Sequence, residues 1–521
     1  MRNYGNGLLV AVLVLILVGR STPVAQAETN DTSQDAIIPA TSLKTLPFPQ
    51  SITVSSGSVI LPAKFYCQFN DHKLQSLIPI LNTEYQLFTG GRVVTRSDST
   101  KSSGQLSLAL DPALDQQAYR LVIDSNVQVT GGSYQAVAMA GITLWQLLER
   151  QTDGQFAVPR VTISDSPALP FRALLIDVAR KWHDVSTLEQ LIELTRWYKI
   201  NYVQLHLTDN ELFTFPTTAF PELTSPDKHY TKAELRGLVE YARDRGVTLI
   251  PEIDVPGHAR LMIERRRDKF GFATELKDGK QRPLSTINIG RTAAYTALDK
   301  LIGELAQVFS TSPYIHMGGD EANLEPLLAD AEVRRYMSAH NLTNLDELYR
   351  HFIVRMNEIV KRHGKQMIVW EGFKKAGQVE IPRDVIVMAF ETAYQLPQDL
   401  LAGGYKVINT SWQPLYVVNE RNWDPAYIYT TWNPYRWENP FPQHPSFKPI
   451  QLEPNPQVLG AMMCAWEQPP EVELSSLRQR LAAFSERVWH GGLQPERSVS
   501  WFENAFVHTD AGLSALLTPA K

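Results

Sequence analysis

Cysteine is nearly absent from this sequence. Cys67 and Cys464 are the two cysteines among 521 residues, and they lie about 400 positions apart. A disulfide scaffold is therefore excluded, and neither thiol has a second cysteine nearby that would indicate a redox or zinc motif. We expect both to be small buried residues of the core.

An excess of charge of one sign is also missing. The 50 Lys and Arg nearly balance the 55 Asp and Glu, which leaves a net charge of −5. Because there is no basic tract, this composition argues against nucleic acid as the main partner. The content of 44% hydrophobic and 20% charged residues is ordinary for a folded protein, and 521 residues suffice for about two to four domains.

Long hydrophobic runs are confined to the N-terminus. Arg2 precedes an apolar run from Leu8 to Val18, and Ala25-Gln26-Ala27 follows it. A positive charge, a short apolar run and a small-x-small cleavage site are the parts of a secretory signal peptide. We predict that residues 1–27 are this signal and that the mature chain is exported, to the periplasm or outside the cell, with no stable membrane span. An uncleaved anchor is the alternative.

Residues 28–166 have the pattern of a small mixed domain. Ser51 to Leu61 and Tyr119 to Ile123 alternate like strands, while Tyr134 to Arg150 carries an apolar face at helical spacing. No titratable cluster stands out here. We predict a non-catalytic α+β domain that ends at the turn residues Ser164-Asp165-Ser166-Pro167.

Eight short apolar runs follow from residue 167 to the C-terminal region, and amphipathic helical stretches separate the early ones. The runs are Ala173 to Val178, Tyr202 to Leu207, Thr248 to Ile253, Tyr314 to Gly318, Met367 to Trp370, Val385 to Phe390, Lys406 to Thr410 and Leu459 to Trp466. Strands alternating with helices predict an α/β fold, a (β/α)8 TIM barrel over residues 167–521 with a C-terminal helical end. A doubly wound open sheet is the alternative, but no G-x-G-x-x-G motif or P-loop supports nucleotide binding.

Polar residues gather where these runs end. They are Asp177, His206, Asp209, Glu252, Asp254, His258, Asp320, Glu321, Trp370 and Glu371. A core strand gains nothing from charged groups at its end, whereas a barrel enzyme builds its active site there.

The sharpest motif is His316-Met317-Gly318-Gly319-Asp320-Glu321. Adjacent side chains on a strand point to opposite faces, but Gly318-Gly319 allows a break in the pleat, so that both carboxylates can turn into one site. Like charges held close raise one pKa, which yields a protonated acid beside an ionised partner. Glycoside hydrolysis needs such a pair.

Several ordered motifs resemble glycoside hydrolase family 20, the β-N-acetylhexosaminidases, over nearly the whole mature chain. Residues 171–180 (FRALLIDVAR) resemble the family's first barrel strand, and Lys199-Ile200-Asn201 with His206-Leu207-Thr208-Asp209 resembles the second. Residues 250–258 (IPEIDVPGH) resemble the third strand, and His316 to Glu321 the catalytic strand. The region before the barrel resembles the family's non-catalytic α+β domain.

The resemblance implies an exo-acting enzyme that releases terminal β-linked N-acetylglucosamine or N-acetylgalactosamine with retention, by a substrate-assisted mechanism. It implies that Glu321 is the acid and then the base, and that Asp320 holds the 2-acetamido group while its oxygen attacks the anomeric carbon. It implies no metal and no organic cofactor.

The resemblance also implies roles for residues around this pair. Arg172 is expected to clasp ring hydroxyls, and Gln468 to stand where the outer hydroxyls bind. Aromatic residues are expected to line the acetamido pocket and the sugar ring, namely Trp370, Phe390, Tyr416 and Trp466. Residues that orient and tune the acid are expected to be Asp209, Asp254 and His258.

The chain departs from the family pattern in several places. Phe390 stands where a Trp is expected, and Val418 where the family often has an acidic or amide residue. After Trp466, Glu467 precedes Gln468, whereas the family usually places a Glu two residues on. A substituted sugar, or a relaxed choice between gluco and galacto forms, would fit these changes. The loop Asn210-Glu211-Leu212 also differs from the usual pattern.

Residues 412–447 hold ten aromatics and repeated prolines. We predict a long, semi-rigid loop over the active-site mouth that offers sugar-stacking surface; a packed structural insertion is the alternative.

Two rival functions remain. His206, Asp209, His258, His316 and Asp320 could be ligands of a metal-dependent barrel hydrolase, although no His-x-His or His-Glu-x-x-His spacing supports zinc. A non-catalytic sugar-binding protein on the same fold is the other, since fold alone does not establish function. No feature of the sequence indicates an oligomeric state.

Overall fold

The computed structural model describes residues 42–95, 105–419, 421 and 423–517. The expected signal peptide, residues 1–27, and the expected start of the mature chain lie outside this part. Among the described residues, none of the helices is both long enough and apolar enough to cross a membrane.

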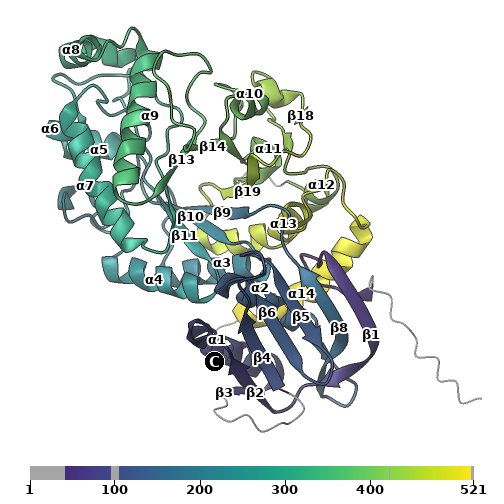
Figure 1. Cartoon of the computed structure of the whole chain (residues 1–521). Helices are drawn as coiled ribbons and strands as arrows, with labels where there is room; N and C mark the ends of the chain where they lie inside the picture. Colours follow the sequence, from purple (N-terminus) through teal and green to yellow (C-terminus); the bar gives the residue numbers. More distant parts are fainter. Residues whose placement is uncertain (1–41, 96–104, 420, 422, 518–521) are drawn as a thin grey trace, which may run out of the picture. The chain divides into compact units, whose positions relative to one another are not determined.

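The first part of the described chain forms a mixed eight-stranded sheet (Figure 1). Its path runs β1 (Ser51–Ile60), β8 (Phe156–Asp165), β5 (Tyr119–Ile123), β6 (Val127–Gly131), β4 (Gln105–Leu110), β2 (Lys64–Phe69) and β3 (Arg92–Thr95), with β7 (Glu149–Arg150) on β8. The pairs β1–β8, β8–β5 and β5–β6 are antiparallel, and the remaining pairs along the path are parallel.

Two helices pack against this sheet, α1 (Leu77–Thr89) and α2 (Tyr134–Gln146). The predicted helix from Tyr134 ends four residues earlier than expected, because Glu149–Arg150 instead pair with β8 as β7. Nearly every side chain of α2 is buried. One reason is that α2 also contacts the second part of the chain, where Gln146 Nε2 donates to the carbonyl of Trp197 at 2.9 Å.

Eight parallel strands then close into a barrel. They are β9 (Phe171–Asp177), β10 (Tyr202–His206), β11 (Thr248–Glu252), β12 (Tyr314–His316), β13 (Gln366–Trp370), β14 (Ile386–Ala389), β15 (Lys406–Asn409) and β19 (Val458–Ala465). Closure is explicit, because β19 pairs with β9 on one side and with β15 on the other. The predicted (β/α)8 barrel is confirmed, and the open sheet is excluded.

Burial on both faces explains why these strands read as continuous apolar runs. All seven residues of β9 are buried, between the barrel interior and the surrounding helices. Cys464 lies on β19 inside this core and Cys67 lies in the core of the first sheet, so the prediction that both cysteines are buried is confirmed.

Helices surround the barrel. Those following its strands are α3 (Val185–Trp197), α4 (Lys232–Asp244), α5 (Arg260–Arg265), α6 (Arg267–Phe270), α7 (Thr292–Val308), α8 (Ala331–Ala339), α9 (Leu345–Arg362), α10 (Pro397–Ala402) and α13 (Pro470–His490). Side-chain caps start several of them: Asp184 caps α3, Thr231 and Glu234 form a capping box on α4, and Asn344 caps α9. The last helix, α14 (Val499–Leu517), packs against α1, α2 and α3.

Residues 412–447 are mostly a packed insertion and not the predicted loop. They form α11 (Trp412–Leu415), β16 (Tyr416–Val417), α12 (Pro425–Thr430) and β17 (Arg436–Trp437), followed by the 3-10 turn η5 (Pro445–Phe447), and β17 pairs with β18 (Ile450–Gln451). Trp432 is buried against Phe484 of α13, and buried Trp437 donates its Nε1–H to the carbonyl of Ala389 at 3.2 Å. Burial of these rings stabilises the fold and removes them from any contact with a ligand.

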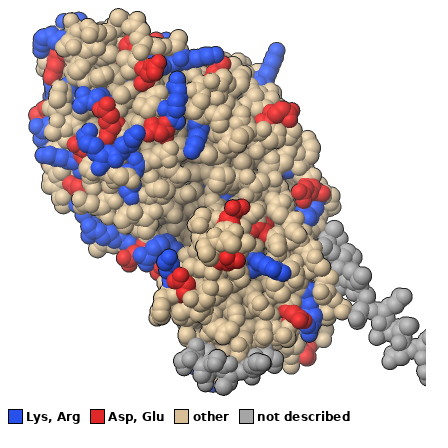
Figure 2. Space-filling model, in the orientation of Figure 1, with Lys and Arg blue, Asp and Glu red and all other residues tan. Residues whose placement is uncertain are grey.

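Charged residues are mixed on the surface. On the face that Figure 2 displays, Lys and Arg alternate with Asp and Glu, and no continuous track of one sign crosses it. This agrees with the nearly balanced composition.

Candidate active site

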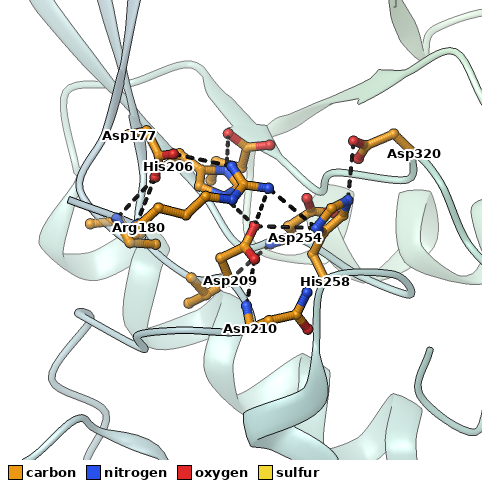
Figure 3. A network of polar contacts seen from close by, with 12 residues as sticks. Asp177, Arg180, His206, Asp209, Asn210, Asp254, His258 and Asp320 are labelled. Atoms are coloured by element: carbon orange, nitrogen blue, oxygen red, sulfur yellow. Dashed lines mark hydrogen bonds and ion pairs between the residues drawn. The ribbon is translucent and has the colours of Figure 1, made fainter. Parts of the chain in front are cut away.

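A connected set of charged side chains occupies the carboxyl end of the barrel (Figure 3). Its members follow the ends of β9, β10, β11 and β12. They are Asp177, Arg180, His206, Asp209, Glu252, Asp254, His258, Asp320 and Glu321. Because parallel strands bring their carboxyl ends to one rim, groups from four separate strands share one site.

The catalytic motif breaks the pleat directly after β12. Gly318 and Gly319 have φ angles of 68° and 107°, in the left-handed region. A Cβ on Gly318 would lie 1.8 Å from Oδ1 of Asp254, so this position admits no side chain. Glu321 itself has a φ of 48°, a conformation that a non-glycine residue keeps where its surroundings enforce it. The predicted break is confirmed.

Hydrogen bonds anchor this loop to neighbouring strands. The N–H of Trp370 donates to the carbonyl of Gly318 at 2.9 Å, and the N–H of Gly319 donates to Oδ1 of Asp254 at 3.3 Å. From α9, the buried hydroxyl of Tyr349 donates to the carbonyl of Gly319. The backbone before Asp320 is thus held from three directions.

His258 contacts both carboxylates of the pair. Its Nε2 lies 3.4 Å from Oε2 of Glu321 and 3.6 Å from Oδ2 of Asp320. The side chain of Asp320 is 14% exposed, whereas that of Glu321 is 59% exposed. Asp320 therefore belongs to the floor of the site, and Glu321 stands at its opening.

The two carboxyls have opposite pKa shifts. Burial raises the pKa of Asp320, and the neighbouring Glu321 and Glu252 carboxylates add to this rise against the opposing effect of His258. The hydrogen bond with His258 lowers the pKa of Glu321. Although burial opposes it, the Asp254 and Asp320 carboxylates raise the pKa of His258 well above its usual value.

These shifts run opposite to the expected division of roles, in which Glu321 is the acid and Asp320 its ionised partner. The pKa of Asp254 is likewise raised well above its usual value by burial and by Asp320. The reason is tertiary, because His258 reaches Glu321 from a different strand.

A relay of ion pairs extends from His258 to β9 (Figure 3). Nδ1 of His258 lies 3.3 Å from Oδ2 of Asp209, which in turn lies 2.7 Å from Nη2 of Arg180. Nη1 of Arg180 reaches Oδ2 of Asp177 at 3.1 Å. Asp209 thus orients both His258 and Arg180, as the role predicted for it requires.

Below this relay, Glu252 holds the side chains at the bottom of the site in place. It is fully buried and lies within 3.0 Å of His206 Nδ1 and of His316 Nδ1. Trp370 Nε1 and Gln204 Nε2 each donate to it at 2.9 Å. Despite its burial, the two imidazoles lower the pKa of Glu252 well below its usual value, so this carboxylate is a fixed negative charge.

Aromatic rings complete a cavity of about 200 Å³ above the pair. It is lined by Arg180, His258, Asp320, Glu321, Phe390, Trp412, Tyr416, Val418, Trp466 and Glu467. The Phe390 and Tyr416 rings are parallel at 6.3 Å, and the Trp466 ring centroid lies 6.0 Å from that of Tyr416. Trp370 packs behind them, 1% exposed, with its centroid 5.6 Å from that of Phe390. The structure therefore brings the four predicted aromatics together, three of them on the cavity wall.

Arg172 is not in this site, and its predicted role is wrong. It is the second residue of β9, at the opposite end of the strand from Asp177, and it is fully buried. Its guanidinium donates to the carbonyls of Lys199 and Leu169, each at 2.9 Å, and to Oε1 of Gln117 at 2.8 Å. Arg172 thus ties the barrel to the first domain.

The place expected for Gln468, where the outer hydroxyls of the sugar bind, is also wrong. It is buried and its Oε1 accepts a hydrogen bond from Ser476 Oγ at 3.3 Å, so it does not line the cavity. Glu467, whose φ is 55°, turns into the cavity instead, with Oε1 4.0 Å from Nε of Arg180. The acidic side chain that enters the cavity therefore stands one position after Trp466, on a residue with a left-handed backbone.

Two lining residues were missed, Arg180 and Glu467. Arg180 could have been found, because it follows the carboxyl end of β9 whereas Arg172 stands at the beginning, and barrel sites form at carboxyl ends. Glu467 could not, because a positive φ at a non-glycine residue has no sequence signal.

Two groups of side chains here have the composition of a metal site: His206, Glu252 and Asp254, and Asp209, Asp254 and His258. Their atoms are already engaged. His206 lies between two carboxylates, 3.1 Å from Asp209 and 3.0 Å from Glu252, and Asp209 receives Arg180. Cations of the chain itself thus take the positions that a metal would need.

Comparisons with known proteins agree with this geometry. The model described as "Glycosyl hydrolase family 20, catalytic domain" matches residues 169–492, and the one described as "Glycosyl hydrolase family 20, domain 2" matches residues 42–166.

Curated relatives carry related names. A chitooligosaccharidolytic beta-N-acetylglucosaminidase of Ostrinia furnacalis is 28% identical over 409 residues, which covers 72% of this chain and 66% of the relative. A beta-hexosaminidase of Vibrio furnissii is 26% identical over 396 residues, covering 70% and 63%. The chain thus spans slightly less than two thirds of the length of these two relatives.

Solved structures share the fold. The GH20 exo beta-N-acetylglucosaminidase from Vibrio harveyi, in complex with N-acetylglucosamine, superposes with a TM-score of 0.73 at 24% identity, covering 92% of this chain and 78% of that one. The beta-N-acetylhexosaminidase from Bacteroides fragilis gives a TM-score of 0.76 at 22% identity, covering 90% and 95%.

Proposed function

Because this chain belongs to glycosyl hydrolase family 20, we propose that it is an exo-acting β-N-acetylhexosaminidase that removes terminal β-linked N-acetylglucosamine or N-acetylgalactosamine. One observation carries the proposal: a largely buried Asp320 and an exposed Glu321 share one cavity with four aromatic rings. Such a cavity fits a single pyranose, whose apolar C–H face packs on aromatic rings and whose hydroxyls need charged partners.

The two carboxyls divide the chemistry between them. Asp320, on the floor, accepts the N–H of the 2-acetamido group, while the acetamido oxygen attacks the anomeric carbon. Glu321, at the opening, gives its proton to the glycosidic oxygen as the bond to the leaving group breaks. The oxazolinium-type intermediate is positive, and the ionised Asp320 stabilises it. Glu321 then takes a proton from the water that opens the ring, which returns the sugar with retained configuration.

This sequence of steps requires a protonated Glu321 beside an ionised Asp320. A bound sugar covers Glu321, and loss of water raises the pKa of a carboxyl. His258, whose Nε2 lies 3.4 Å from Oε2 of Glu321, is the neighbour that can supply the proton. The Asp254 carboxyl is the neighbour that can keep the second proton and leave Asp320 ionised.

Recognition of the ring hydroxyls falls to Arg180 and Glu467. The guanidinium of Arg180 packs 5.3 Å from the Trp466 ring centroid and lines the cavity beside Glu467. A fork of donors beside a carboxylate suits a vicinal diol. Val418, on the same wall, offers no hydrogen bond, so we propose that the choice between the gluco and galacto epimers is relaxed.

The experiment is hydrolysis of aryl β-N-acetylglucosaminide and aryl β-N-acetylgalactosaminide by the purified full chain, with and without EDTA. We expect turnover of both that is insensitive to the chelator and falls by more than about 100-fold in Glu321→Gln and Asp320→Asn. Loss of turnover in EDTA would favour the metal-dependent rival. Sugar binding without turnover by the wild-type chain would favour the binding-protein rival.

Export is a separate proposal, supported by Arg2, the Leu8–Val18 run and Ala25-Gln26-Ala27. N-terminal sequencing of the protein recovered from its native host is expected to begin near Glu28. A mature chain that retains Met1 would contradict it.

A further inference from the structure

A second cavity opens beside the catalytic pair and is larger than the first, about 300 Å³. It is lined by Asn210, His258, Arg260, Asp278, Arg282, Pro283, Leu284, Ser285, Glu321 and Asn323. His258 and Glu321 line both cavities, so the exposed carboxyl of Glu321 stands at their junction.

The position of Glu321 between the two cavities indicates what the second cavity holds. On the proposed function, Glu321 protonates the oxygen that joins the terminal sugar to its leaving group. If the terminal sugar fills the aromatic cavity, the leaving group lies on the other side of Glu321. The structure provides a cavity there. Its lining includes Asn210 and part of residues 277–283, a loop that a bridge between Lys277 and Pro283 closes.

Arg260 is held in the wall of this cavity by the Asn210 backbone and side chain. Its backbone N–H donates to Oδ1 of Asn210 and its Nη2 donates to the carbonyl of Asn210, both at 3.1 Å. The N–H of Asn210 in turn donates to Oδ1 of Asp209 at 2.5 Å, so Arg260 is anchored to the same loop as the catalytic relay (Figure 3). Asn210, in the loop that departs from the family pattern, thus positions Arg260.

The acidic neighbours of Arg260 do not neutralise it. Its nearest carboxylate, Oε1 of Glu264, is 3.8 Å from Nε, and the Arg260 side chain remains 42% exposed. Arg282 is held by Asp278, whose Oδ2 lies 2.7 Å from both Nε and Nη2, yet its side chain is 69% exposed. Around the cavity, Arg260, Arg282 and the His258 imidazolium face two carboxylates, Asp278 and Glu321. When His258 has passed its proton to Glu321, one carboxylate, Asp278, faces two cations, Arg260 and Arg282.

We propose that this cavity selects leaving groups that carry a carboxylate, and that Arg260 is the residue that recognises it. An anion gains charge attraction from Arg260 and Arg282 as well as hydrogen bonds, whereas a neutral sugar gains hydrogen bonds alone. The substrate class is therefore a terminal β-N-acetylhexosamine linked to an acidic sugar, and this inference rests on the proposed function.

A matched pair of disaccharides tests the charge. In both, N-acetylglucosamine is β-1,4-linked to an amino sugar whose 3-hydroxyl carries a lactic acid ether; one has the free carboxylate, the other its methyl ester. The pair has nearly equal bulk and the same leaving hydroxyl. We expect the full chain to hydrolyse the carboxylate form with a kcat/KM about three- to fivefold higher, the size of a partly exposed ion pair, and the ratio to fall as salt is added.

Substitutions of Arg260 test whether this residue causes the preference for the carboxylate. Arg260→Met should bring the ratio to about one, and Arg260→Lys should keep part of it, because the charge remains without the fork of donors. Arg236→Met, an exposed residue of α4 outside both cavities, is the control and should leave the ratio unchanged.

The outcomes separate the two proposals. Equal rates on the two forms, a faster ester, a ratio that survives Arg260→Met, or failure to cleave either disaccharide while the aryl glycoside is turned over would each overturn the selectivity proposal. Failure on the aryl glycoside as well would overturn the proposed function itself.

Discussion

Substitutions of Arg180 and Arg172 are expected to affect activity and stability separately. Arg180→Met removes the guanidinium that lines the sugar cavity and pairs with Asp177 and Asp209 at 3.1 and 2.7 Å. Arg172→Met removes one that makes three buried hydrogen bonds at 2.8–2.9 Å, outside the cavity. The first variant should lose activity in a stable protein, and the second should lose stability.

The magnitudes follow from these contacts. Without Arg180, a bound sugar loses about two charge-assisted hydrogen bonds, each about 1.5–2 kcal/mol, so kcat/KM should fall by about 100- to 1000-fold. Asp177 and Asp209 keep other partners, the backbone N–H groups of Ala179 and Asn210 among them, so Tm should change little. Without Arg172, three buried acceptors lose their donor at about 1 kcal/mol each, and Tm should fall by about 5–10 °C.

The assay is steady-state hydrolysis of the aryl glycoside, together with thermal unfolding of each variant. Arg180→Lys is the matched control, because it keeps the charge without the donor fork and should fall between wild type and Arg180→Met. A normal kcat/KM in Arg180→Met, or a raised KM at unchanged Tm in Arg172→Met, would refute the assignment of the two arginines.

Three further predictions concern the groups around the catalytic motif. Burial raises the pKa of Glu371 to about 8, so the folded protein keeps a proton that the unfolded chain releases above about pH 4.5, and the free energy of unfolding should fall by about 3–5 kcal/mol between pH 4.5 and pH 8. Glu371→Gln should therefore raise Tm at pH 8 and leave Tm nearly unchanged at pH 4.5. Equal changes in Tm at the two pH values would contradict the raised pKa. Gly318→Ala should abolish activity, since its Cβ would meet Asp254 at 1.8 Å, whereas Gly364→Ala, with a φ of 72° and open space around it, should cost about 1 kcal/mol of stability and keep full activity. Tyr349→Phe should lower kcat about tenfold at unchanged KM, because it removes the hydroxyl that holds the Gly319 carbonyl, and a change in KM alone would place its effect in binding instead.

The barrel could be predicted because its strands are buried on both faces. Such strands must be apolar throughout, as all seven residues of β9 are, and they leave their signature in the sequence. The catalytic pair could be predicted for a related reason: two carboxylates after two glycines at a strand end are costly unless they act.

Other features depend on groups that the sequence separates widely. The pKa shifts of the pair depend on His258, more than 60 positions before Glu321, and the residue that enters the cavity is Glu467, on a left-handed backbone, and not Gln468. Aromatic content alone did not distinguish rings that line the cavity, such as Trp412, from rings buried in the insertion, such as Trp437. The burial, protonation and orientation of a side chain depend on its neighbours in the folded protein, and not on its own segment of the sequence.

Local patterning of the sequence thus predicted the barrel strands and the pairing of Asp320 with Glu321, and the resemblance to family 20 supplied most of the aromatic wall. The tertiary structure decided that Arg172 is buried between the barrel and the first domain, that His258 shifts the pKa values of both carboxyls, and which charges line the second cavity. Arg172 is the second residue of the seven-residue strand β9, about 20 Å long, whereas Arg180 lies three residues beyond its carboxyl end, and closure of the barrel makes that end the site.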